Sequence, residues 1–362
     1  MKAELLAQAQ AWLADDPDPQ TRAELQALLD ADDETAVADR FAGFLEFGTA
    51  GLRGALGAGP NRMNRVVVGR AALGLIAYLQ ERHRTRVVVG YDARHNSERF
   101  ALDTVELLRG AGMEALLMPR VLPTPVLAFA VEHLDADAGV MVTASHNPPQ
   151  DNGYKVYLGG EVDGVVYRGS QIVPPADAQI AAHINAVTSL ASAPRGTGWD
   201  IVDEATITAY CNAVTATVGA SSARDISIVH TALHGVGTEI VRRVFAQAGF
   251  TQLQSVPEQA NPDPDFPTVA FPNPEEPGAI DLAIALAQRD AVDLVIANDP
   301  DADRCAAAIN DPDLGWRMLR GDEVGVLLGD HLAASLKNSA PPPVLAASIV
   351  SSTMLARIAE HH

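Results

Sequence analysis

Cysteine is scarce in this sequence, and its two copies form no paired or metal-binding pattern. Cys211 and Cys305 lie far apart among 362 residues, and neither has a metal-ligand neighbour at zinc-site spacing. These features exclude a disulfide-stapled scaffold and a zinc-finger module. We expect a reduced, intracellular chain.

Positive charge is also in short supply. The 26 Lys and Arg residues face 46 Asp and Glu residues, which gives a formal net charge of −20. This charge disfavours nonspecific binding to nucleic acid and to anionic membranes, so we expect neither as a partner. If the ligand is an anion, the few cations must be gathered locally. The sequence carries no signal for an oligomeric state.

Long hydrophobic runs are missing. No uninterrupted apolar stretch is long enough to span a bilayer, and the acidic, helix-prone segment after Met1 lacks the apolar core of a signal peptide. We therefore expect a cytoplasmic protein. A chain of 362 residues with 48% hydrophobic residues is large enough to form two or more packed domains.

Helical and short apolar segments alternate along most of the chain. Residues 1–40 predict a helical extension, which Asp-Pro-Asp-Pro at 16–19 interrupts, and a glycine-rich loop follows at 47–54. Helical patterns then alternate with short apolar runs at 69–82, 87–89, 98–111, 116–118, 125–133 and 139–142. This alternation is typical of an α/β domain with a mostly parallel sheet.

The alternation restarts after a small, polar segment at 190–200, which we interpret as a linker. The second series predicts a strand at 226–229, a helix at 237–249, a long ordered loop at 257–277, a helix at 279–289 and a strand at 294–297. A last helix, strand and helix are predicted at 321–336, 344–349 and 352–360.

The predicted fold class is α/β, with successive three-layer domains and mixed, mostly parallel sheets. The predicted division is an N-terminal helical extension at 1–40, domain I at 41–195, domain II at 200–312 and a partial domain III at 318–362. One strand between two helices cannot bury a sheet on both faces. We therefore expect the chain to be a fragment of a longer protein.

Three polar loops follow predicted strands, where open α/β sheets bind their ligands. They are residues 91–94, 143–149 and 298–304. In the last loop Asp299, Asp301 and Asp303 alternate, and carboxylates this close repel one another unless a cation lies between them. Oxygen ligands suit Mg²⁺, while the framework of a calcium-binding EF-hand is absent. The competing interpretation is a solvated acidic turn.

Ser145 stands in the second loop, within Thr-Ala-Ser-His-Asn-Pro at 143–148. As a lone serine it would serve more often as a helix N-cap than as a nucleophile. The Gly-x-Ser-x-Gly pattern of a hydrolase is absent around it. A hydroxyl near a triple-carboxylate metal site instead indicates phosphoryl chemistry, because Mg²⁺ neutralises phosphoserine oxygens.

Three further residues have two interpretations each. His146 is either a structural hydrogen-bonding residue or a base, and Lys155 is either a surface charge or a catalytic cation. Arg53 lies in the glycine-rich loop, where it is either an ordinary surface residue or a phosphate ligand that binds through its planar guanidinium.

Together these loops resemble the α-D-phosphohexomutase superfamily, which includes phosphoglucomutases and phosphomannomutases. Residues 143–148 resemble its phosphoserine loop, 299–304 its metal loop, 47–54 its N-terminal active-site segment and 152–155 its lysine-bearing segment. Segments 231–237 and 271–278 are similar to the branch that holds bacterial phosphoglucomutases and animal phosphopentomutases. The resemblance covers nearly the whole chain from about residue 40.

The resemblance implies a mutase mechanism. Ser145 would carry a phosphoryl group, pass it to a hexose phosphate through a bisphosphate such as glucose 1,6-bisphosphate, and recover the other phosphoryl group. Mg²⁺ would be held by the phosphate oxygen on Ser145 and by the side chains of Asp299, Asp301 and Asp303.

The remaining site residues would bind phosphate or move protons. Arg53 and Arg304 would contact the phosphoryl region and stabilise its charge, and Asn147 belongs to the same phosphate-binding set. His146 or Lys155 would be the general acid/base. The choice among glucose, mannose and pentose phosphates stays open.

The family has four domains, and its sugar-binding loop of the third and phosphate loop of the fourth have no counterpart before His362. We therefore expect the chain to keep the metal site but to isomerise substrate poorly. Two rival classes stay open: a phosphatase with an aspartyl nucleophile, and a non-catalytic chain that binds sugar phosphate or a partner.

Overall fold

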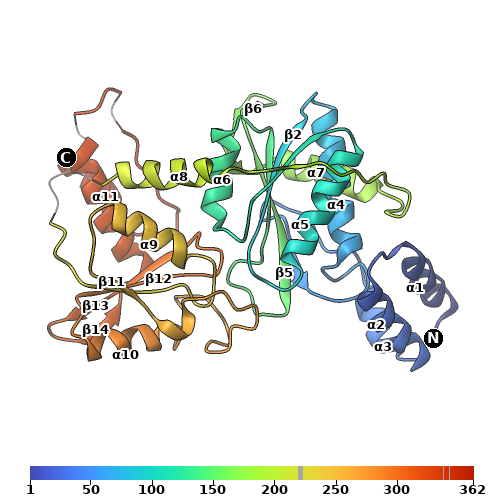
Figure 1. Ribbon diagram of the computed structural model, residues 1–362, viewed down its shortest axis with the longest axis horizontal. Helices are drawn as coiled ribbons and strands as arrows, with labels where there is room; N and C mark the ends of the chain where they lie inside the picture. The colour runs from blue at the N-terminus through green and yellow to red at the C-terminus, as the bar shows by residue number, and fades with distance from the viewer. Residues whose placement is uncertain (219–222, 337, 342) are drawn as a thin grey trace.

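The N-terminal segment forms three helices that stand apart from the two sheets, as Figure 1 shows. The computed structural model describes residues 1–218, 223–336, 338–341 and 343–362. The three helices are α1 (Ala3–Asp15), α2 (Pro19–Asp30) and α3 (Glu34–Arg40). Asp18 caps α2 by accepting from the Gln20 amide at 2.9 Å, so the Asp-Pro-Asp-Pro sequence separates α1 from α2 as predicted.

The first α/β unit is built on a seven-stranded sheet of order β1-β5-β4-β2-β3-β9, with β8 paired to β5. Its parallel strands are β2 (Arg86–Tyr91), β3 (Glu114–Leu117), β4 (Ala138–Val142) and β9 (Asp200–Ile201). Its antiparallel side is formed by β1 (Leu52–Ala55), β5 (Asp151–Leu158) and β8 (Ser170–Gln171). A hairpin of β6 (Glu161–Val162) and β7 (Val165–Val166) stands outside this sheet.

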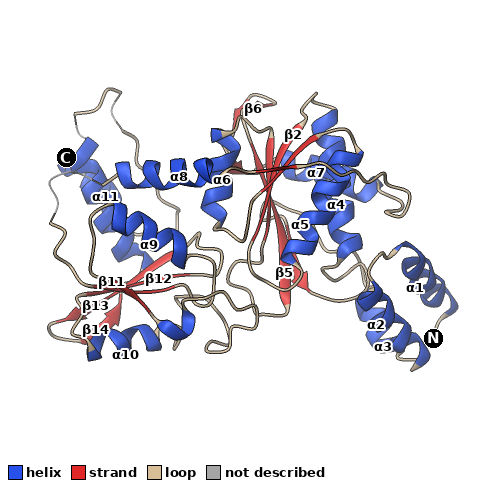
Figure 2. Ribbon diagram, viewed as in Figure 1, coloured by secondary structure: helices blue, strands red, loops and turns tan. Residues whose placement is uncertain are grey.

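Helices cover both faces of this sheet (Figure 2). One face carries α4 (Arg65–Gln80) and α5 (Ser97–Gly110), with α7 (Ala176–Ala186) packed on α4, and the other carries α6 (Thr124–His133). Successive side chains of β2 point to opposite faces of the sheet, so each face has its own hydrophobic cluster. Val87 and Val89 pack in one cluster, and Val88 packs in the cluster on the opposite face. In this arrangement the carboxyl ends of β2 and β4 face the second unit.

The second α/β unit has a five-stranded sheet of order β11-β10-β12-β13-β14. Its strands are β10 (Ile228–Thr231), β11 (Leu253–Ser255), β12 (Leu294–Asn298), β13 (Cys305–Asp311) and β14 (Gly315–Met318). The first three run parallel and the last two antiparallel. Its helices are α8 (Glu204–Ala216), α9 (Thr238–Gln247), α10 (Asp281–Arg289) and the 3-10 turn η1 (Pro257–Gln259).

The predicted α/β fold class is confirmed, but one local prediction is wrong. The segment at 190–200, interpreted as a linker, runs from α7 to β9 without a helix or strand of its own before Asp200, and it packs on the first unit through the buried Leu190. The structure describes α11 (Gly321–Leu336) and α12 (Met354–His361), with no strand at 344–349 between them. Within the described residues no strand pairs with 344–349, and Val344 and Ile349 are almost fully exposed. Among the described helices, none is long and apolar enough to cross a bilayer.

Candidate active site

Ser145 lies at the carboxyl end of β4 and faces the second unit. Its backbone is left-handed, with φ of +53°, and its amide donates to Thr143 Oγ1 at 2.9 Å. Its hydroxyl donates to Asp299 Oδ2 at 2.7 Å, and the residue is 1% exposed. No helix begins here, so the N-cap interpretation is wrong. A strained backbone at a non-glycine residue is a feature of functional loops.

Arg94 fixes the loop that carries Ser145. Its guanidinium donates to the carbonyls of Ser145 at 2.6 Å, Asn147 at 2.5 Å, Pro148 at 2.9 Å and Asp151 at 3.1 Å. Burial lowers the pKa of Arg94, and the adjacent Asp92 carboxylate opposes that shift. The sequence marked residues 91–94 as a polar strand-end loop, but it did not identify Arg94 as the residue that organises its neighbour.

The aspartate triplet follows β12 in the second unit. Asp299, Asp301 and Asp303 each place a carboxylate oxygen within 4.8 Å of the other two, so the group can hold a metal ion. Asp299 and Asp301 are fully buried, and Asp301 Oδ1 has no hydrogen-bond partner. Buried anionic oxygens without a partner suit a hard divalent cation such as Mg²⁺. The interpretation as a solvated turn is therefore wrong.

Two groups of the first unit bind Asp301. The buried Lys155 of β5 donates to Asp301 Oδ2 at 2.7 Å and to Asp303 Oδ2 at 2.8 Å. Thr124, the first residue of α6, donates its hydroxyl to Asp301 Oδ2 at 2.7 Å and its amide to the Asp301 carbonyl at 2.9 Å. Lys155 is 2% exposed, so the surface-charge interpretation is wrong. The sequence did not identify Thr124.

The local charges shift the pKa values of these groups in different directions. Burial raises the pKa of Asp299, and the Asp301 and Asp303 carboxylates add to the rise. Burial acts in the same direction on Asp301, but the Lys155 ammonium outweighs it and lowers the pKa of Asp301. Burial lowers the pKa of Lys155, but the two carboxylates outweigh it and leave that pKa raised. Lys155 is therefore held as a cation.

The remaining predicted residues lie around this centre. His146 Nδ1 is 3.2 Å from Ser145 Oγ, and burial together with Arg304 and Arg53 lowers the pKa of His146 to about 4, so the ring is neutral at pH 7. The Arg304 amide donates to Asp299 Oδ1 at 3.1 Å, while its side chain is 45% exposed. Arg53 Nε is buried without a partner. Asn147 Nδ2 donates to Asp151 Oδ2 at 2.9 Å.

A segment of the second unit covers the imidazole. The Phe271 ring meets the His146 ring edge-on, with centroids 5.7 Å apart, and Phe266 lies 4.9 Å from the Arg94 guanidinium. Both phenylalanines belong to the proline-rich loop that the sequence predicted to be ordered. The site is thus assembled from both units, because the Ser145 and Thr124 hydroxyls and the Lys155 ammonium of the first unit bind carboxylates of the second.

Comparisons with known proteins identify the family. Two family models match, described as phosphoglucomutase/phosphomannomutase alpha/beta/alpha domain I over residues 45–191 and domain II over residues 208–315. The chain is 48% identical over 303 residues to a probable phosphomannomutase of Haemophilus influenzae, covering 83% of this chain and 61% of that protein. It is 36% identical over 386 residues to a phosphoribomutase of Saccharomyces cerevisiae, covering 96% of this chain and 60% of that protein.

A solved structure shows the same fold. The phosphoglucomutase/phosphomannomutase family protein of Burkholderia thailandensis has a TM-score of 0.67 at 21% identity, covering 88% of this chain and 64% of that one. The chain belongs to the phosphoglucomutase/phosphomannomutase family of the α-D-phosphohexomutase superfamily, which confirms the resemblance. It spans less than two thirds of the length of these relatives.

Proposed function

We propose that this chain carries the phosphoryl-transfer centre of a phosphosugar mutase, in which Ser145 takes up and returns a phosphoryl group. The observation that carries the proposal is the 2.7 Å contact from Ser145 Oγ to Asp299 Oδ2, which joins the serine loop of one unit to the aspartate triplet of the other. The mutase names of the relatives support the same reaction class. The proposed substrate is a hexose phosphate, with phosphoryl transfer between its 1- and 6-positions through glucose 1,6-bisphosphate or its analogue.

Each transfer exchanges one phosphorus–oxygen bond for another. The bond from phosphorus to Ser145 Oγ breaks, a bond to the sugar hydroxyl oxygen forms, that hydroxyl gives up its proton, and Ser145 Oγ takes one up. The neutral His146 ring lies close enough to Oγ to exchange that proton. Lys155 and Arg304 contribute fixed positive charge beside the transferring group.

Asp299, Asp301 and Asp303 are the residues proposed to hold Mg²⁺, together with a phosphate oxygen on Ser145. The ion supplies positive charge that offsets the charge of the transferring phosphoryl group. We propose small sugar phosphates as the partners and the cytoplasm as the location of this reaction.

Labelling of the chain tests the proposal. The 362-residue chain with Mg²⁺ and radiolabelled glucose 1,6-bisphosphate is expected to gain label on Ser145, and added glucose 6-phosphate is expected to remove it. Ser145→Ala should take up none, while the exposed Ser170→Ala should label normally. Label on an aspartate, cleaved by hydroxylamine, would instead support the aspartyl phosphatase, and an unlabelled chain would support a binding protein.

A pentose phosphate is the second candidate substrate, because the yeast phosphoribomutase matches 96% of this chain. A chase of the labelled chain with ribose 5-phosphate, mannose 6-phosphate and glucose 6-phosphate separates the candidates. The preferred sugar is expected to remove the label fastest.

A further inference from the structure

The two carboxylate oxygens of Asp301 have different surroundings. Oδ2 accepts from the Thr124 hydroxyl and from Lys155 Nζ, each at 2.7 Å. Oδ1 has no hydrogen-bond partner among the residues that the structure describes, although Asp301 is fully buried. A carboxylate oxygen has about two acceptor positions, so two donors fill those of Oδ2. Oδ1 is therefore the oxygen that remains for a metal ion.

Thr124 belongs to the first unit and binds Asp301 at two points. It is the first residue of α6, and no side chain caps this helix after Pro123. Besides the hydroxyl contact, the Thr124 amide donates to the Asp301 carbonyl at 2.9 Å, so a residue of the second unit accepts from the helix start. The dipole of α6 also favours an anion at this position. The backbone contact fixes Thr124 relative to the carboxylate that its hydroxyl binds.

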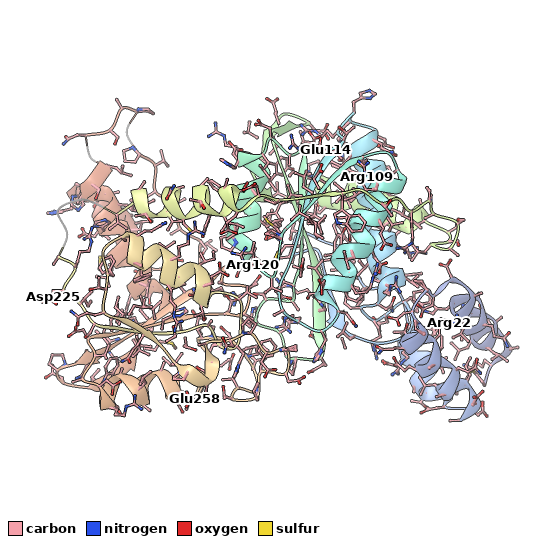
Figure 3. The ribbon with its side chains drawn as sticks, viewed as in Figure 1. Arg22, Arg109, Glu114, Arg120, Asp225 and Glu258 are labelled. Atoms are coloured by element: carbon pink, nitrogen blue, oxygen red, sulfur yellow. The ribbon has the colours of Figure 1, made fainter. Side chains whose placement is uncertain are left out.

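Further contacts hold both partners of this interaction in place. Arg120, four residues before Thr124, donates to Glu239 Oε2 of the second unit at 3.1 Å, and Figure 3 shows Arg120 between α6 and α9. Within the second unit, the Val236 amide donates to the Pro300 carbonyl at 2.8 Å and so fixes the metal loop beside Asp301. The segment before α6 and the metal loop are therefore each anchored independently of the hydroxyl contact.

We propose that Thr124 is a positioning residue for the metal centre, which holds Asp301 Oδ2 and thereby presents Oδ1 alone to Mg²⁺. The inference rests on the proposed function, because it takes the aspartate triplet as the Mg²⁺ site. Mg²⁺ requires short contacts in a nearly ideal octahedron, whereas Ca²⁺ accepts both oxygens of one carboxylate at longer distances. A carboxylate that is held at one oxygen favours the smaller ion. Thr124 therefore also contributes to the preference for Mg²⁺ over Ca²⁺.

Lys155 does not set this orientation by itself. Its ammonium also donates to Asp303 Oδ2 at 2.8 Å, and an ammonium on a flexible stem can follow a carboxylate that rotates. The Thr124 side chain is short and β-branched, so it has few rotamers and its hydroxyl has a defined direction. Lys155 therefore supplies the counter-charge of Asp301, and Thr124 supplies the orientation of its carboxylate.

Calorimetric titration of the full chain with Mg²⁺ and, separately, with Ca²⁺ tests the proposal. Thr124→Val keeps the shape of the side chain and the backbone contact but removes the hydroxyl. It should weaken Mg²⁺ binding by about 10- to 100-fold, the usual effect of losing a residue that orients a metal ligand, and Ca²⁺ binding by less. Thr124→Ser keeps the hydroxyl and should retain both affinities. The matched control is Thr104→Val, because this buried hydroxyl donates to the Phe100 carbonyl within α5, and it should also retain both.

The ratio of the two affinities separates positioning from a structural defect. A merely structural role of Thr124 would weaken both ions alike, so equal losses of Mg²⁺ and Ca²⁺ affinity in Thr124→Val would overturn the proposal. Unchanged Mg²⁺ affinity in that variant, or the same loss in Thr104→Val, would also overturn it while the Mg²⁺ site of the proposed function stands. A parent chain that binds neither ion would overturn both. If valine disturbs folding, Thr124→Ala gives the same comparison without the added methyl group.

Discussion

At the scale of single residues, burial of paired charges dominates this site. Lys155 and Asp301 are 146 positions apart in the chain, and both are buried. The sequence therefore left Lys155 open between a surface charge and an active-site cation, because burial is a property of the tertiary contacts. The aspartates could be predicted, since their spacing is local and their repulsion follows from it.

Removal of the Lys155 charge should destabilise the chain strongly. Lys155→Met leaves the buried Asp301 carboxylate without its counter-ion, which costs about 3–5 kcal/mol when one partner of a buried pair is lost. Urea unfolding in the presence of a chelator measures the free energy. The matched control is Arg357→Met, because Arg357 is exposed and forms a surface pair with Glu360, and its loss should be at most about 1 kcal/mol. Equal losses in the two variants would contradict the account.

A buried histidine should make stability depend on pH. His230 of β10 contacts Asn298 Oδ1 through Nε2 at 3.0 Å, and burial lowers its pKa from 6.5 to about 4. The unfolded chain takes up a proton near pH 6.5 while the folded chain resists it to about pH 4. Its contribution is therefore fully present above pH 6.5 and is lost as the pH falls toward 4, by about 3 kcal/mol in all.

The variant His230→Gln measures this contribution, because glutamine does not titrate. The difference in unfolding free energy between variant and parent should shift in the variant's favour by about 3 kcal/mol from pH 7 to pH 4. His133→Gln, at an exposed histidine, should show no such shift. A constant difference for His230→Gln across this range would show that the imidazole is not the cause.

At the scale of elements, strand ends decide where the chemistry lies. The loops at 91–94, 143–149 and 298–304 were predictable, because polar runs after apolar strands mark the carboxyl edge of a sheet. The strand β5 was not predicted, since Asn152 and Lys155 interrupt its apolar pattern although both are buried. The opposite error, a strand at 344–349, came from an apolar pattern that finds no pairing partner among the residues that the structure describes.

Gly235, in the turn before α9, should tolerate no side chain. A Cβ at Gly235 would lie 2.2 Å from Pro300 Cα, so Gly235→Ala must push the metal loop away. We expect a loss of about 1–3 kcal/mol in the free energy of unfolding and weaker Mg²⁺ binding by calorimetry. The same substitution at Gly325 in α11 meets no atom within 4 Å and should stabilise by about 0.5–1 kcal/mol. Tolerance of alanine at Gly235 would refute the contact.

At the scale of the whole molecule, the centre exists only where the two units meet. Figure 1 shows the two sheets in neighbouring parts of the molecule. The first unit contributes Ser145 and Lys155 to the site, and the second contributes the three aspartates. The fold class and the family resemblance could be predicted because each unit repeats a local pattern. The mutual placement of Ser145 and Asp299 followed only from the family resemblance, because the residue pattern alone does not show the inter-unit contacts of Thr124, Arg120 and Phe271 on which it depends.

The central claim is that a phosphate on Ser145 faces a divalent cation held by the three aspartates. Electron–nuclear double resonance of bound Mn²⁺, substituted for Mg²⁺ in the Ser145-phosphorylated chain, measures this proximity directly. We expect a ³¹P coupling to the metal, which is absent in Ser145→Ala and is lost together with metal binding in Asp301→Asn. Tightly bound Mn²⁺ without ³¹P coupling in the phosphorylated chain would contradict it.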